Sequence, residues 1–63
     1  MNNTYYVIQY RRTGDIIPKW YTKSGLYNRP EDTGKTLALM AKYPDLYAET
    51  KVVQLTVNTT ADQ

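Results

Sequence analysis

Apolar and polar positions divide the chain into short segments with different periods. Residues 5–10 (YYVIQY) are rich in aromatic and β-branched side chains, a composition typical of a strand. Residues 16–22 (IIPKWYT) predict a second strand, and the turn at Thr13-Gly14-Asp15 joins the two segments into a hairpin. Because Pro18 has no amide hydrogen for a ladder, we expect the second strand at an edge of the sheet.

The apolar spacing then changes to that of a helix. Asn28 is placed to cap the first free amides, and Glu31 three residues later completes a capping box, so a helix is predicted to begin near Pro30. Pro44 disfavours helical geometry at the residue before it, which predicts a helix end near Lys42. Residues 51–57 (KVVQLTV) alternate and predict a third strand.

These elements predict an α+β fold of ββαβ type, with a three-stranded sheet in the order 2-1-3 and one helix packed on one face. A right-handed crossover leads to this order. We expect one domain over residues 1–63, with an ordered core at about 5–57 and a polar tail at 58–63. The side chains expected beneath the helix are Tyr6, Ile8, Tyr10, Trp20, Val53, Leu55 and Val57. The face left uncovered is expected to carry Tyr5, Val7, Gln9, Arg11, Lys19, Tyr21, Val52, Gln54 and Thr56.

Composition limits the sources of stability and the kinds of chemistry available. A chain of 63 residues buries only about 60% of its unfolded surface, so its stability is expected to be marginal. There is no Cys for a disulfide and no His, and the six acidic residues are scattered, which argues against a structural zinc site. We therefore expect no metal and no cofactor.

No group of residues suggests catalysis. Ser24 is the single serine, and its neighbour Lys23 lies in the same predicted loop, which does not make a catalytic dyad. Glu31-Asp32 is explained by the helix dipole. Gly34-Lys35-Thr36 resembles the end of a P-loop but lies within the predicted helix and lacks the first glycine. We expect a protein that is not an enzyme.

Binding remains as the function, and the aromatic composition points to the uncovered sheet face. The chain has seven Tyr, one Trp and no Phe, and Tyr, Trp and Arg dominate binding hot spots. The predicted partner-binding residues are Tyr5, Val7, Arg11, Lys19 and Tyr21. A rival interpretation is single-stranded nucleic-acid binding, in which Tyr5 and Tyr21 stack bases while Arg11 and Lys19 hold phosphates. The net charge of only +2 favours a protein partner. A third interpretation is self-association, because an unpaired edge strand permits a homodimer.

Several short segments resemble those of small accessory proteins encoded by bacteriophages. The resemblance covers residues 5–57 and rests on Tyr6-x-Ile8-Gln9-Tyr10-Arg11, Trp20, Pro30-Glu31-Asp32, Tyr43-Pro44-Asp45 and Val52-Val53. It implies a protein that binds and inhibits a host bacterial protein. No apolar run approaches the ~20 residues of a membrane span, and no secretion leader is recognisable. The expected location is the host bacterial cytoplasm, without membrane contact.

Overall fold

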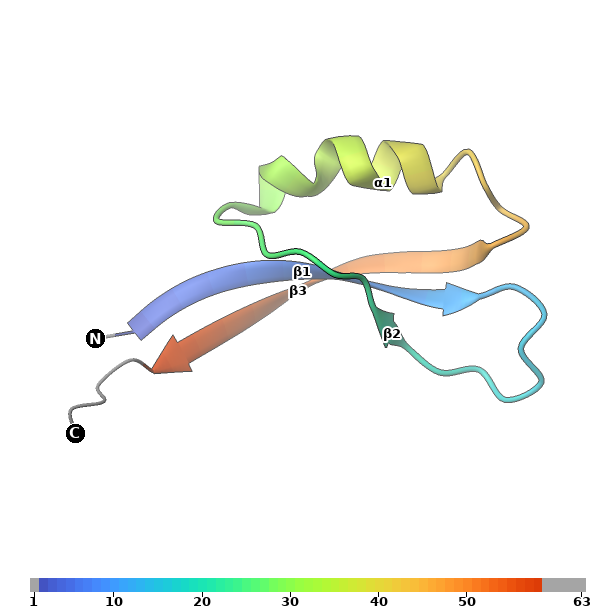
Figure 1. The fold of residues 1–63 in the computed structure, drawn as a ribbon, viewed down its shortest axis with the longest axis horizontal. Coiled ribbons are helices and arrows are strands. Elements are labelled where there is room, and N and C mark those ends of the chain that lie inside the picture. Colours follow the sequence, from blue (N-terminus) through green and yellow to red (C-terminus); the bar gives the residue numbers. More distant parts are fainter. Residues whose placement is uncertain (1, 59–63) are drawn as a thin grey trace.

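The structure, a computed structural model, describes residues 2–58. Of the polar tail predicted at 58–63, Asn58 is instead the last residue of the third strand, and residues 59–63 lie outside the described residues. The elements are β1 (Asn2–Arg12), β2 (Tyr21–Thr22), a 3₁₀ turn η1 (Pro30–Thr33), the helix α1 (Gly34–Met40) and β3 (Tyr47–Asn58). Figure 1 shows α1 lying across one side of the sheet, while the first part of β1 and the last part of β3 continue beyond it as a two-stranded arm.

The three strands form one antiparallel sheet in the order β2-β1-β3, which confirms the predicted fold class and strand order. β1 and β3 pair along almost their whole length, from Asn2 opposite Asn58 to Arg12 opposite Tyr47, with an irregularity between Arg11 and Arg12. β3 thus begins at Tyr47, earlier than predicted. The alternation of apolar and polar residues over 51–57 identified this strand. Residues 47–50 also pair with β1, but they show no such alternation.

β2 is much shorter than predicted. Only Tyr21 and Thr22 pair with β1, opposite Tyr10 and Gln9, and one further bridge joins Tyr6 to Tyr27. Ile16 and Ile17 are 97% and 79% exposed in the connecting loop. Pro18 explains the short strand, because it cannot donate to the ladder and fixes its own backbone angle.

The helix begins differently from the prediction. Residues Pro30–Thr33 form a 3₁₀ turn preceded by Arg29, and no side-chain cap bond is made, so the capping box of Asn28 and Glu31 does not form. Arg29 instead bonds Asp32 through Nη2 at 3.1 Å. This hydrogen bond, then the charges of Asp32 and Glu31, raise the pKa of Arg29. α1 ends at Met40, close to the predicted end.

The backbone contacts decide which side chains face the helix. Tyr27 pairs directly with Tyr6, and the Tyr27 hydroxyl lies 2.9 Å from the Thr36 hydroxyl of α1. Tyr6 therefore faces α1, and Ile8 and Tyr10 share that face because side chains alternate along a strand. The face that carries Tyr6, Ile8 and Tyr10 is called the helix face below, and the opposite one the distal face.

The described core is small. Val7, Ile8 and Met40 are the buried apolar residues, and Thr33 joins them, its hydroxyl bonded to the Pro30 carbonyl at 2.6 Å. Beside this core, Tyr10 stacks on Tyr21 at 5.5 Å between centroids and meets Tyr47 edge-on at 5.0 Å. The radius of gyration is 14.0 Å, whereas a compact chain of this length has roughly 11 Å. The molecule is therefore extended, with much apolar surface left in solvent.

Candidate protein-binding surface

The distal face is assembled from β1, β3 and the residues around β2. Register places Tyr5 opposite Leu55, Val7 opposite Val53, Gln9 opposite Lys51 and Arg11 opposite Glu49, and directly opposed residues point to the same side of a sheet. Thr22 joins this face opposite Gln9. The distal face consists of Tyr5, Val7, Gln9, Arg11, Trp20, Thr22, Glu49, Lys51, Val53, Leu55 and Val57.

One half of the distal face is apolar and partly exposed. Leu55 and Val57 are 40% and 44% exposed, and Tyr5 and Val53 are half-buried beside them. Val7 lies at the centre of this half and is only 4% exposed, so it supports the surface without offering contact area of its own. Tyr5, Val53, Leu55 and Val57 are neighbouring apolar side chains on one sheet face, and they form a patch of the kind that marks interaction sites.

The other half of the distal face holds a tryptophan between basic side chains. The guanidinium carbon of Arg11 lies 4.6 Å from the Trp20 ring centroid, and Lys51 Nζ lies 4.1 Å from it. Arg11 Nη1 also donates to Glu49 Oε1 at 2.9 Å. Cation–π contacts at partly exposed sites contribute about 0.5–1 kcal/mol each. Arg11 and Lys51 thus hold the indole ring in place at the end of the apolar half.

The charges of this half are unequal. Glu49 neutralises Arg11, while Lys51 has no carboxylate within ion-pair distance among residues 2–58. Gln9 Nε2 donates to the Thr22 hydroxyl at 3.2 Å, which ties β2 to the sheet beside Lys51. The surface therefore offers one uncompensated positive charge next to an ordered aromatic ring.

The structure divides the five predicted binding residues between the two faces. Tyr5 and Arg11 lie on the distal face, and Val7 is buried beneath it. Tyr21 instead stacks on Tyr10 on the helix face and bonds Asp15 through its hydroxyl at 3.0 Å. Lys19 lies with it, 5.0 Å from the Tyr21 centroid. The expectation that all five share one face is wrong, because Tyr21 is directly opposite Tyr10 and so takes the side of Tyr10.

Two further predictions about the faces are also corrected. Val53, Leu55 and Val57 were expected beneath the helix, but they oppose Val7, Tyr5 and Asn3 and lie on the distal face. Trp20 was expected beside Tyr6 and Ile8, yet it contacts Arg11 and Lys51. By the same register Val52, Gln54 and Thr56 lie on the helix face. The sequence prediction missed two parts of this surface: the apolar half of the distal face, and the group of Trp20, Arg11 and Lys51, called the Trp20 cluster below.

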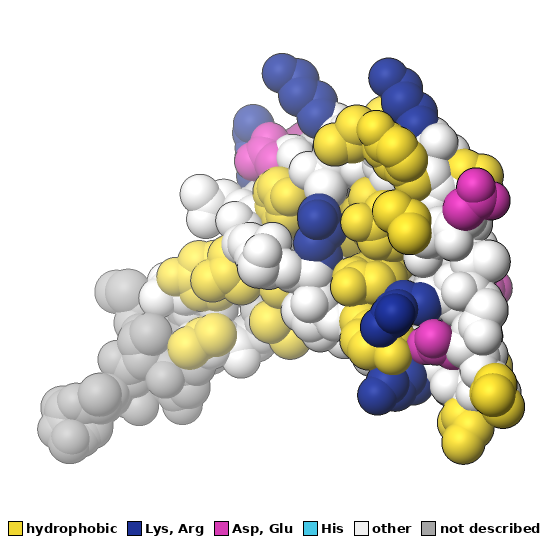
Figure 2. Space-filling model, turned by 45° about the vertical axis from the view of Figure 1, so that its right-hand side comes forward, with side chains coloured by type: hydrophobic (Ala, Val, Ile, Leu, Met, Phe, Trp, Pro, Cys, Tyr) yellow, Lys and Arg dark blue, Asp and Glu magenta, His cyan; other side chains and the backbone are white. Residues whose placement is uncertain are grey.

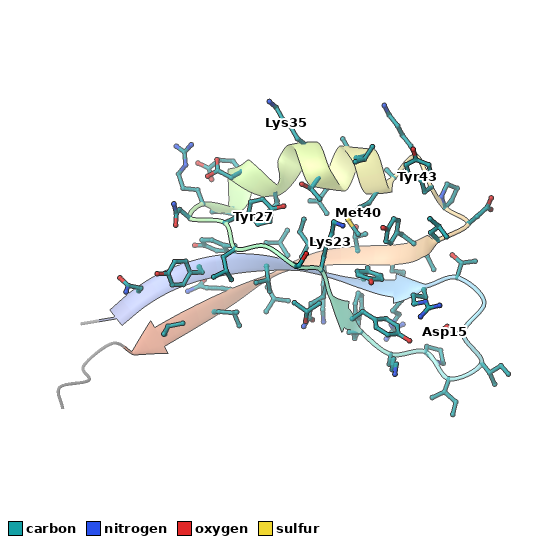
Figure 3. The ribbon with its side chains drawn as sticks, in the orientation of Figure 1. Asp15, Lys23, Tyr27, Lys35, Met40 and Tyr43 are labelled. Atoms are coloured by element: carbon teal, nitrogen blue, oxygen red, sulfur yellow. The ribbon has the colours of Figure 1, made fainter. Side chains whose placement is uncertain are left out.

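The remaining surface offers less to a ligand. An open pocket of about 150 Å³ lies where α1 meets the start of β3, lined by Lys23, Leu39, Met40, Tyr43, Leu46 and Tyr47, and it is smaller than the ~300–1,000 Å³ of typical small-molecule sites. Figure 3 shows Lys23 directed toward Met40, and Lys35 pointing outward from the helix. Hydrophobic side chains reach the surface in several places, with lysines and arginines between them (Figure 2).

The described residues offer neither a metal site nor a membrane-spanning helix. Residues 2–58 contain no group of three or more acidic, His or Cys side chains placed to hold a metal ion. The described helix is too short and too polar to cross a membrane. Comparisons of the chain with protein-family models, curated proteins and solved structures find no match.

Proposed function

We propose that this chain is a non-enzymatic protein-binding module whose distal face is the contact surface. The observation that carries the proposal is the position of Leu55 and Val57, which are 40% and 44% exposed on the sheet face opposite α1 (Figure 1). Burying such side chains contributes about 25 cal/mol per Å² of apolar area. A partner surface laid on this face gains that contribution from a sheet that is already formed.

The Trp20 cluster supplies the second requirement of a binding surface, which is a well-held anchor. Trp, Tyr and Arg are the residue types most enriched in binding hot spots, and Trp20, Tyr5 and Arg11 all lie on the distal face. Because Arg11 and Lys51 contact the ring, less side-chain entropy is lost when a partner binds. The uncompensated Lys51 favours a partner that places a carboxylate beside an apolar centre.

The small core gives a thermodynamic reason for a partner. Three buried apolar residues among those that the structure describes are few for an independent domain. A ligand that binds only the folded state stabilises it by mass action. At a concentration 100 times its dissociation constant, such a partner adds about 2.7 kcal/mol. The proposal therefore includes a higher melting temperature for the complex than for the free chain.

The class of partner is taken from the resemblance to small bacteriophage accessory proteins. On that basis we extend the proposal to a host bacterial protein, which the chain inhibits by covering part of its surface. The distal face supports binding by its chemistry, while inhibition rests on the resemblance.

A quantitative pull-down with matched variants tests the proposal. Leu55→Glu places a charge in the apolar half of the distal face, and Leu39→Glu makes the same change on α1, where Leu39 is 54% exposed. We expect the wild type and Leu39→Glu to capture the same bacterial protein in a stoichiometric amount, and Leu55→Glu to lose it. Circular dichroism checks that both variants fold. Equal capture by the two variants contradicts the assignment to the distal face.

A further inference from the structure

The outer edge of β3 is the longest unpaired edge in the described part of the chain. In the sheet order β2-β1-β3, the other side of Tyr47–Asn58 has no neighbour. Figure 1 shows this edge running past the helix into the two-stranded arm. A long free strand edge is a template for pairing with another strand.

The backbone pattern shows which groups of β3 face outward. Tyr6 exchanges two backbone hydrogen bonds with Tyr27, and the Ile8 carbonyl accepts one from the Lys23 amide. The backbone amide and carbonyl groups of the even-numbered residues of β1 therefore point away from β3. The odd-numbered ones, from Tyr5 to Arg11, must bond β3. Their partners are the odd-numbered residues of β3. The residues of β3 whose amide and carbonyl groups point outward are therefore Thr50, Val52, Gln54 and Thr56.

The features that usually protect an edge strand are missing from most of this edge. Proteins block edges with prolines, bulges and charged side chains. β3 contains no proline, its charges are confined to Glu49 and Lys51, and the irregularity of the β1–β3 ladder lies beyond them at Arg11 and Arg12. Residues 52–57 are therefore open to pairing along the whole second half of the strand.

We propose that two copies of this chain pair through β3, antiparallel, with the two-fold axis at Gln54. This register sets Gln54 opposite its own copy, Val53 opposite Leu55 of the other copy, and Val52 opposite Thr56. It also sets Thr50 opposite Asn58 of the other copy, so all four outward-facing residues can pair. Apolar residues stay together on the distal face, and the hydrophobic pattern of a strand fixes its register.

The charges agree with a second copy as the occupant. Lys51 falls opposite Val57 of the other copy, so its aliphatic stem covers the valine while the ammonium group reaches water. Glu49 stays outside the main overlap, beside Arg11, which it already contacts at 2.9 Å. No like charges oppose one another, whereas an axis at Lys51 brings two lysines together. The same two-fold pairing gives one six-stranded sheet in which the two apolar distal halves adjoin.

Single cysteines test the pairing, because the natural chain has no Cys. Residues in a hydrogen-bonded antiparallel pair have Cα atoms about 5.5 Å apart, which suits a disulfide. Gln54, Val52 and Thr56 are all exposed, so the substitutions Gln54→Cys, Val52→Cys and Thr56→Cys are tolerated. On mild oxidation, we expect a disulfide-linked dimer to form fastest for Gln54→Cys, by about tenfold over the other two.

A backbone test is independent of side chains. Gln54→Pro removes an outward-facing amide that the monomer does not use, whereas Val53→Pro removes one that bonds β1. We expect sedimentation of the wild type to approach twice 7.3 kDa as concentration rises. Gln54→Pro should keep the circular dichroism of the wild type and weaken association about tenfold or more, while Val53→Pro should unfold the chain. Fastest cross-linking at Val52 or Thr56, or a wild type that stays at the monomer mass, overturns the proposal, which does not depend on the proposed protein-binding function.

Discussion

Replacing Met40 by Ala tests whether α1 is held in place by the burial of the Met40 side chain. Met40 is 2% exposed and lies in the core with Ile8, which is fully buried. Truncating a buried Met to Ala removes its transfer free energy and leaves a cavity, which together cost about 2–5 kcal/mol. The free energy of unfolding of a domain of this size is only about 3–9 kcal/mol, from ~0.05–0.15 kcal/mol per residue. One substitution therefore removes at least about a fifth of the stability, and all of it where the loss is large and the stability small.

Thermal unfolding followed by circular dichroism measures this loss. A small domain loses about 4–8 °C of melting temperature per kcal/mol, so a loss near 3 kcal/mol lowers the melting temperature by about 12–24 °C. The neighbouring Leu39→Ala is the matched control, because Leu39 is 54% exposed on the same helix and its truncation should cost about 1 kcal/mol or less. If Leu39→Ala destabilises the chain as much as Met40→Ala, the helix packs through a different side and the reasoning is refuted.

Three other outcomes are expected. Gly25→Ala should lower the free energy of unfolding in a urea titration by roughly 1–3 kcal/mol, because Gly25 has a φ of +116° and a left-handed backbone strains any other residue. An unchanged urea midpoint argues against this loop geometry. Glu49→Gln should lower the free energy of unfolding by under about 1 kcal/mol, and by less at high salt, because the Arg11 and Glu49 side chains are 39% and 56% exposed. A larger loss in thermal unfolding that does not depend on salt contradicts this weak surface ion pair. A gel shift with single-stranded DNA or RNA should show no binding at about 50 mM salt, because Tyr21 and Arg11 lie on opposite faces of the sheet.

The strand order was predictable because it depends on local signals and a general rule. A turn begins at Thr13 and the helix ends before Pro44, as the sequence indicates, although the connection between the first two strands runs from residue 13 to residue 20. The right-handed crossover then leaves one order. The length of β2 was not predictable from strand composition alone, since Ile16 and Ile17 resemble strand residues but are exposed in a loop.

The side chains that make up the distal face could not be predicted from the sequence. Alternation divides β3 into two sets, but only the register with β1 decides which set faces the helix. The more apolar set, which includes Leu55 and Val57, was assigned to the helix face. In the structure, Tyr10, Tyr21 and Tyr47 supply the apolar area on that face instead, and the aliphatic set is left exposed.

Site-specific photo-crosslinking tests the central claim, that the distal face binds a partner, most directly. A photoreactive phenylalanine analogue replaces Tyr5 on the distal face or, as control, Tyr43, which is 50% exposed beyond the end of α1. The mass of a cross-linked product distinguishes a second copy of the chain from another protein. In bacterial lysate we expect the Tyr5 position to give one discrete product with another protein and the Tyr43 position to give none. A product from the Tyr43 position alone, or from neither position, contradicts the assignment of the distal face as the binding surface.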